Sequence, residues 1–158
     1  MATSPEDLMR RTLALAVDNV RARRGGPFAA LVVRGGEVIA EGTNRVTTTN
    51  DPTAHAEVVA VREACRRLGS FELAGCEVFA SCEPCPMCLG ALYWARIDRL
   101  WFAAGREAAA AAGFDDAHIY AEVPRPPEER VLATRRLLVE EASAPFTAWA
   151  ELPGRVEY

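Results

Sequence analysis

Apolar residues recur at the three- and four-residue spacing of amphipathic helices in several parts of the chain. Gly25 and Gly69 follow two of these patterns and are typical of helix ends, whereas Asp51 and Pro52 favour the start of the second one. In that second helix the apolar positions are Val58, Val59, Val61, Cys65 and Leu68. The pattern predicts helices over residues 5–24, 51–68, 84–96, 106–113 and 145–152.

Short β-rich runs lie between these helices. The stretch "FAALVVRGGEVIAEG" has two such runs around Gly35-Gly36, which indicates a hairpin. "CEVFASC" and "DRLWFAA" predict two further strands, and the β-branched start of residues 130–142 favours a strand there over a helix. Strands that alternate with helices indicate an α/β sheet covered by helices, with functional groups at the carboxyl ends of strands.

Composition narrows the class of protein without identifying it. The 158 residues fit one domain, and no apolar run is long enough to span a membrane. The net charge of −4 argues against a nucleic acid as the main partner, although small arginine runs occur at 21–24 and 66–67. The N-terminus does not read as a secretory signal, so we expect a cytoplasmic protein. In that compartment, and with an odd count of five cysteines, a disulfide framework is not expected.

Three of the cysteines, at 82, 85 and 88, cluster within seven positions. Cys85 and Cys88 are spaced to face the same way at the start of a helix, and His55 also lies at a helix start. These three side chains predict one Zn²⁺ site per chain whose fourth position is left to water, the arrangement of a catalytic zinc. Cys82 with Cys85 forms an overlapping pair, and a redox dithiol or a fully structural zinc site with Cys82 as fourth ligand stays open.

Glu57 lies two residues after His55 and need not bind the same metal. It is placed to act as general acid–base for a zinc-activated water. The combination H-x-E followed by P-C-x-x-C is the signature of zinc deaminases that act on nucleobases. The chain therefore resembles the cytidine-deaminase-like superfamily.

Within that superfamily the chain resembles the bacterial guanine deaminases nearly from end to end. The motifs "NDPTAHAEV" and "SCEPCPMCLGALYWAR" identify the superfamily, whereas "AGFDDAHIYAEV", "PFTAW" and the terminal "EY" carry the resemblance to guanine deaminases. The resemblance implies a three-layer fold with a central mixed five-stranded sheet. It implies hydrolysis of guanine to xanthine and ammonia, with Glu57 as the proton shuttle. It also implies a homodimer in which the segment of about 140–158 is exchanged between subunits.

The same resemblance implies which residues meet the base. Asp116 would be a second catalytic carboxylate, with Asp115 as a rival. The residues implied to bind substrate are Phe28, which stacks on the base, Asn44, which reads its edge with a donor and an acceptor, Ala54, Trp94 and the lid residue Tyr158.

Two positions depart from the family's usual pattern and leave the substrate range open: Ala29 stands where glycine is usual, and His118 replaces an aromatic residue. A tRNA adenosine deaminase shares the zinc motifs, but would be expected to have a lysine–glycine-rich loop where this chain has "GREAAAAAGFDD". A cytosine, cytidine, other aminopurine or triazine deaminase is a further alternative, and a non-enzymatic zinc-binding module is the alternative from another class.

Overall fold

The computed structural model describes residues 3–158. The chain divides into two compact units, Met1–Asp116 and Ala117–Tyr158. The first unit contains every strand of the described residues and all the metal-binding side chains expected from the sequence. The zinc motifs therefore belong to a unit that has its own sheet and its own core.

The sheet of the first unit has the strand order β2-β1-β3-β4. Its strands are β1 (Ala29–Arg34), β2 (Glu37–Thr43), β3 (Cys76–Cys82) and β4 (Arg99–Ala104). β1 is antiparallel to both of its neighbours, whereas β3 and β4 are parallel. The sheet is mixed, as expected, but within residues 3–158 it has four strands and not the five that the resemblance implied.

β1 and β2 form the hairpin that the sequence predicts. Gly35 and Gly36 connect them with φ angles of 58° and 83°. Positive φ at both central residues is the conformation of the two-residue turn that fits the twist of paired strands, and glycine adopts it without a steric penalty. The hairpin prediction is confirmed.

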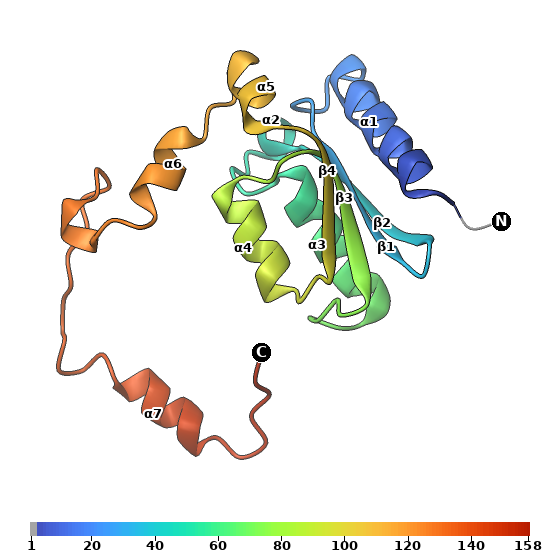
Figure 1. Ribbon diagram of the computed structural model, residues 1–158. Coiled ribbons are helices and arrows are strands. Elements are labelled where there is room, and N and C mark those ends of the chain that lie inside the picture. The colour runs from blue at the N-terminus through green and yellow to red at the C-terminus, as the bar shows by residue number, and fades with distance from the viewer. Residues whose placement is uncertain (1–2) are drawn as a thin grey trace. The chain divides into compact units, whose positions relative to one another are not determined.

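Helices cover both faces of the sheet, which gives three layers (Figure 1). α1 (Pro5–Arg21) lies on one face, and α3 (Ala56–Leu68) and α4 (Pro86–Trp94) lie on the other. Because successive side chains of a strand point to opposite faces, β1 supplies both cores. Ala30 and Val32 belong to the cluster with α3, whereas Leu31 and Val33 belong to the cluster with Leu8 of α1.

α3 begins later than the sequence pattern suggested. Its N-cap is His55 and not Asp51, whose carboxylate instead accepts hydrogen bonds from the backbone N–H and the hydroxyl of Thr53. This aspartate turn competes with the helix for the same backbone, so residues 51–54 form a turn. The helix ends as expected at Gly69, which has a φ of 61°.

The start of α3 lies unusually close to β2. A Cβ atom added to Gly42 would lie 2.1 Å from the carbonyl oxygen of Ala56 and 2.5 Å from the nitrogen of Ala60. Only glycine permits this approach, because the contacted atoms are backbone and do not swing away. The contact fixes the first turn of α3, and with it His55 and Glu57, against the sheet.

Two short helices complete the first unit: α2 (Val46–Thr49) and α5 (Arg106–Ala111). The second unit has α6 (Ala117–Glu122), the 3-10 turn η1 (Pro127–Glu129) and α7 (Ala144–Glu151). No helix of the described residues has both the length and the apolar character that crossing a membrane requires.

The strand predicted over residues 130–142 is wrong for this chain, since these residues form turns and irregular structure. Local alternation and β-branching describe a surface suited to a sheet, but a strand also needs a partner edge. Val131, Leu132 and Leu137 are 85%, 79% and 83% exposed, so the apolar positions that suggested the strand are not buried against a sheet within residues 3–158.

Candidate functional site

His55, Cys85 and Cys88 meet near the carboxyl end of β3, where α4 begins. His55 is the N-cap of α3, Cys85 is the N-cap of α4, and Cys88 lies in the first turn of α4. The Nδ1 atom of His55 lies 3.5 Å from the Sγ atom of each cysteine, and the three ligand atoms lie within 4.8 Å of one another. Two helix starts that are thirty residues apart in sequence thus converge as the motifs predicted.

The donor set fits zinc. Tetrahedral coordination, with Zn–S of about 2.3 Å and Zn–N of about 2.0–2.1 Å, requires each sulfur and the nitrogen to be roughly 3.5 Å apart. That is the separation observed from Nδ1 to both sulfurs. One imidazole and two thiolates are ligand types that zinc prefers, and three protein ligands leave one coordination position for a small molecule.

Hydrogen bonding within this cluster favours the thiolate form of one cysteine. The pKa of Cys85 is lowered to about 4, first because Cys88 donates a hydrogen bond to it and then because His55 does so. The pKa of Cys88 is raised, because its proton is held by Cys85 and because burial and the nearby Glu57 disfavour a second negative charge. The hydrogen bond to Cys85 also raises the pKa of His55. A divalent cation removes this conflict, since it allows both thiols to ionise.

Glu57 lies in the first turn of α3, beside the cluster, and is 8% exposed. Burial raises the pKa of its carboxyl group, and the group also contacts Cys88. A buried carboxyl group with a raised pKa next to a metal site is suited to receive and release a proton. The structure therefore brings Glu57 together with the three predicted metal ligands.

Cys82 is separate from the ligand cluster. It ends β3, and its Sγ atom lies 3.7 Å from the carbonyl oxygen of Gly105. Burial raises the pKa of this thiol, and the charges of Glu57 and Asp116 raise it further. The structure thus favours Cys85 with Cys88 as the metal-binding pair.

Backbone hydrogen bonds connect three of the predicted substrate-binding residues to His55. The N–H of Asn44 donates to the carbonyl of Phe28, and the N–H of Arg45 donates to the carbonyl of Ala54, each at 3.0 Å. Ala54 directly precedes His55 and is buried. Phe28, Asn44 and Ala54 therefore belong to one connected wall that leads to the metal ligands.

The side chain of Asn44 is oriented by this wall. Its Oδ1 atom accepts hydrogen bonds from the N–H groups of Gly26 at 3.2 Å and Val46 at 3.3 Å. Two backbone donors use both lone pairs of that oxygen. We expected Asn44 to contact a base through a donor and an acceptor together. Because its Oδ1 atom already accepts two hydrogen bonds, only Nδ2 is left to bind a ligand.

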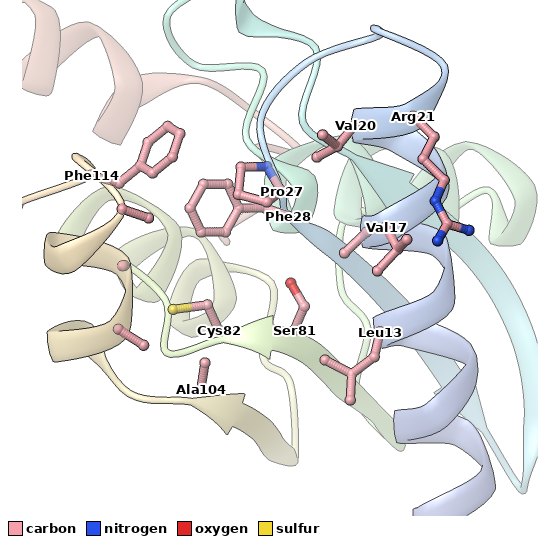
Figure 2. A pocket seen from close by; sticks show the side chains of 14 residues that line it. Leu13, Val17, Val20, Arg21, Pro27, Phe28, Ser81, Cys82, Ala104 and Phe114 are labelled. Atoms are coloured by element: carbon pink, nitrogen blue, oxygen red, sulfur yellow. The ribbon is translucent and has the colours of Figure 1, made fainter.

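Phe28 faces a second aromatic ring that the sequence reasoning missed. The ring of Phe114 lies edge-on to it, with the centroids 4.9 Å apart. Figure 2 shows Phe28 between Phe114 and the α1 side chains Val17 and Val20, in a pocket of about 490 Å³. The position of Phe114 inside the "GFDD" block was the available signal. None of the three metal ligands is among the residues that line this pocket, although Phe28 and Cys82 are.

The remaining predicted residues are placed as follows. Asp116 is half-buried and close enough to Cys82 to affect its pKa, whereas Asp115 is exposed. Trp94 ends α4, at the opposite end from the cysteines, and is 64% exposed. Tyr158, like the exposed His118, belongs to the second unit, and the roles of Trp94 and Tyr158 stay predictions. Ala29 is buried, and its N–H donates to the Ser81 hydroxyl at 3.0 Å.

Residues 2–104 match the family model of the cytidine and deoxycytidylate deaminase zinc-binding region. The chain belongs to this family of zinc-binding deaminases. The match covers every residue of the metal cluster and Glu57, and it ends where β4 ends. The geometry above and the family's zinc-binding region thus coincide.

Individual relatives extend the similarity beyond that region. The chain is 50% identical to a guanine deaminase of Bacillus subtilis over 153 residues, which cover 97% of this chain and 98% of the relative. The crystal structure of guanine deaminase from Bacillus subtilis matches with a TM-score of 0.97 at 49% identity and covers 99% of both chains. A structure described as guanine deaminase from Nitrosomonas europaea matches with a TM-score of 0.69 at 39% identity, over 78% of this chain and 68% of that one.

A tRNA-specific adenosine deaminase of Aquifex aeolicus is also similar, but over less of the chain. It is 47% identical over 78 residues, which are 49% of this chain and 52% of the relative. Percentage identity alone therefore distinguishes poorly between similarity to guanine deaminases and similarity to tRNA-specific adenosine deaminases. The extent of the match separates them better.

Proposed function

We propose that the protein is a zinc-dependent deaminase that hydrolyses guanine to xanthine and ammonia. The observation that carries the proposal is the end-to-end match to a guanine deaminase, at 50% identity over 97% of the chain. This match includes most of residues 105–158, which the general zinc-binding region does not include. Substrate choice within this family depends on what surrounds the shared metal site, so similarity outside that site is the more informative part.

Zinc held by His55, Cys85 and Cys88 would lower the pKa of a water molecule towards about 7 and so supply a nucleophile at neutral pH. In the reaction the water oxygen bonds to C2 of the purine, and the bond from C2 to the exocyclic nitrogen breaks. Glu57 takes one proton from the attacking water and passes it to N3 of the purine. The remaining hydroxyl proton goes to the departing amino group, which leaves as ammonia. The raised pKa of Glu57 supports this role, because the carboxyl group must hold the proton between the two transfers.

Asp116 is our candidate for the second carboxylate, placed to accept a hydrogen bond from the leaving amino group. Its influence on the pKa of Cys82 supports a position near the carboxyl end of β3. Asn44 would donate from Nδ2 to an acceptor on the base, and Phe28 would stack on the ring. We assign Ala54 to the lining of the same site. Trp94 lies at the opposite end of α4 from Cys85, so its assignment to this lining rests on the resemblance alone.

The C-terminal segment, of about 140–158, would be exchanged between the subunits of a homodimer, with Tyr158 closing the partner's site. The support is the exposure of the second unit, where Phe146, Leu152 and Tyr158 are 75%, 50% and 72% exposed. Large apolar side chains exposed together mark a surface that another protein covers. The proposal includes a cytoplasmic location, where thiol ligands stay reduced.

The test is an ammonia-release assay of the zinc-loaded protein on guanine, adenine, cytosine, cytidine and adenosine, together with a tRNA substrate and metal analysis. We expect one zinc per chain and release of xanthine from guanine, with at least tenfold lower kcat/KM on the others. Preferential deamination of adenosine in tRNA, or zinc binding without ammonia release from any substrate, would contradict the proposal.

A further inference from the structure

Asn19 is a fully buried polar residue that none of the zinc-deaminase motifs includes. It lies on α1, two residues before the end of that helix, and its side chain has an exposed fraction of 0%. Its Nδ2 atom donates two hydrogen bonds, one to the carbonyl of Gly26 and one to the carbonyl of Asn44, each at 2.9 Å. One side chain thus joins the first helix to the loop before β1 and to the residue after β2.

The other end of the Asn19 amide indicates why an asparagine is present. Within residues 3–158, its Oδ1 atom is buried without a hydrogen-bond partner. A buried acceptor without a partner destabilises the folded protein, so packing alone would favour an apolar side chain of the same size. The hydrogen bonds that Nδ2 donates must therefore offset this cost. One acceptor is the carbonyl of Asn44, and the other is the carbonyl of Gly26, whose N–H donates to Oδ1 of Asn44.

With Asn19 included, every polar group of Asn44 except Nδ2 is held. The N–H of Asn44 donates to Phe28, its carbonyl accepts from Asn19, and its Oδ1 accepts from Gly26 and Val46. The amide cannot turn over, because backbone N–H groups would then face an amino group. Asn44 is left as a pure hydrogen-bond donor with one fixed direction.

Two glycines allow the loop to approach Asn44 closely enough for this arrangement. A Cβ atom on Gly25 would lie 2.1 Å from the carbonyl oxygen of Asn44. A Cβ atom on Gly26 would lie 3.3 Å from the ring of Phe28, and 3.5 Å from Cγ of Asn44 and from the ring of Phe114. Asn19 then closes the arrangement from the other side, by binding the carbonyls of Gly26 and Asn44 together.

We propose that Asn19 is a positioning residue for base recognition: it holds Asn44 so that the amide presents only a donor to an acceptor on the purine. This rests on the proposed function, in which Asn44 contacts the base. Asn19 itself touches neither substrate nor metal. Its substitution should therefore reproduce the substrate pattern of an Asn44 substitution without affecting the metal.

The experiment compares Asn19→Leu with Asn44→Ala and with the control Thr12→Val. Thr12 is also fully buried on α1, and its hydroxyl bonds to Leu8 of the same helix, so the control removes a buried polar atom without touching the wall. Each zinc-loaded variant is assayed on guanine, on 2-aminopurine, which lacks the oxygen at C6, and on 7-deazaguanine, which lacks the acceptor N7. Zinc content and the thermal midpoint are measured alongside.

We expect Asn44→Ala to lower kcat/KM on guanine by about 10- to 100-fold, mainly through KM, and to have a smaller effect on whichever analogue lacks the acceptor that Asn44 contacts. Asn19→Leu should show the same pattern with full zinc content, and Thr12→Val should not. The double variant should be no worse than Asn44→Ala, because both substitutions remove one interaction. If Asn19→Leu does not fold, Asn19→Ser keeps a shorter donor and should give a partial loss with the same substrate pattern.

A uniform loss on all three substrates, or effects of Asn19→Leu and Asn44→Ala that add, would overturn the inference and leave Asn19 a structural residue only. Parental kinetics in Asn44→Ala would overturn both the inference and the role of Asn44. A parental protein that does not deaminate guanine would contradict the proposed function instead, and the same variants would then be compared on the aminopurine that it does deaminate.

Discussion

Glu57 is the residue whose substitution best separates metal binding from chemistry. It lies beside the cluster but is not one of the three residues whose ligand atoms converge. Glu57→Gln should therefore keep one zinc per chain and lower kcat on guanine by about 10²–10⁴-fold, the usual contribution of a general acid–base group. Atomic absorption and steady-state kinetics on the same sample measure the two properties. Loss of zinc together with activity would instead make Glu57 part of the metal site.

Asp116 and Asp115 offer a matched pair at neighbouring positions. Asp116 is half-buried and influences Cys82, whereas Asp115 is exposed. We expect Asp116→Asn to lower kcat/KM on guanine at least tenfold more than Asp115→Asn does, because one carboxylate of the pair faces the leaving amino group. The reverse ranking in the same assay would move this role to Asp115.

At the scale of single residues, the sequence predicted the residues that bind metal or transfer protons but not the residues that orient them. His55, Glu57, Cys85 and Cys88 follow from residue type and spacing, because metal coordination allows few combinations. Phe114 and Asn19 act through the tertiary contacts of their side chains. An asparagine in an amphipathic helix gives no local signal that it is fully buried.

The start of α4 decides which cysteines bind metal. With Cys85 as N-cap, Cys88 is directed towards His55, while Cys82 remains in β3. Cys88→Ala should reduce bound zinc below about 0.1 per chain, because two ligands do not hold the ion tightly. Cys82→Ala should keep stoichiometric zinc and serves as the control, with metal analysis after dialysis as the measurement. Retention of zinc by the first variant and loss by the second would reverse the assignment.

Element boundaries explain where the sequence prediction was right and where it was wrong. The hairpin, α3, β3 and β4 were predicted because their local patterns agree with the tertiary contacts that they make. The start of α3 was misplaced because Asp51 forms a turn with Thr53 instead of capping the helix. The fifth strand was wrong because β-propensity depends on a partner strand, which a single chain does not provide here.

At the scale of the whole molecule, a short deletion at the end of the second unit tests whether this unit contributes to the active site. Deletion of residues 155–158 should leave a folded protein with full zinc content, since the metal cluster and its sheet lie in Met1–Asp116. If Tyr158 closes a partner's site, guanine turnover should fall at least tenfold, because water then reaches the reacting groups more freely. Kinetics with guanine and guanosine measure both the loss and any gained activity on the larger substrate. Undiminished turnover of guanine would show that the last four residues take no part.

The exposed apolar side chains of Ala117–Tyr158 have a consequence for how activity depends on protein concentration. If a second chain covers them, the active form is a product of association, and its population depends on protein concentration. Specific activity should then be constant at micromolar protein and decline as the assay is diluted towards the dissociation constant of the dimer. Added zinc would not restore it. A rate that is strictly proportional to enzyme concentration down to the lowest measurable level, in protein that sediments as a monomer there, would show instead that each chain is active alone.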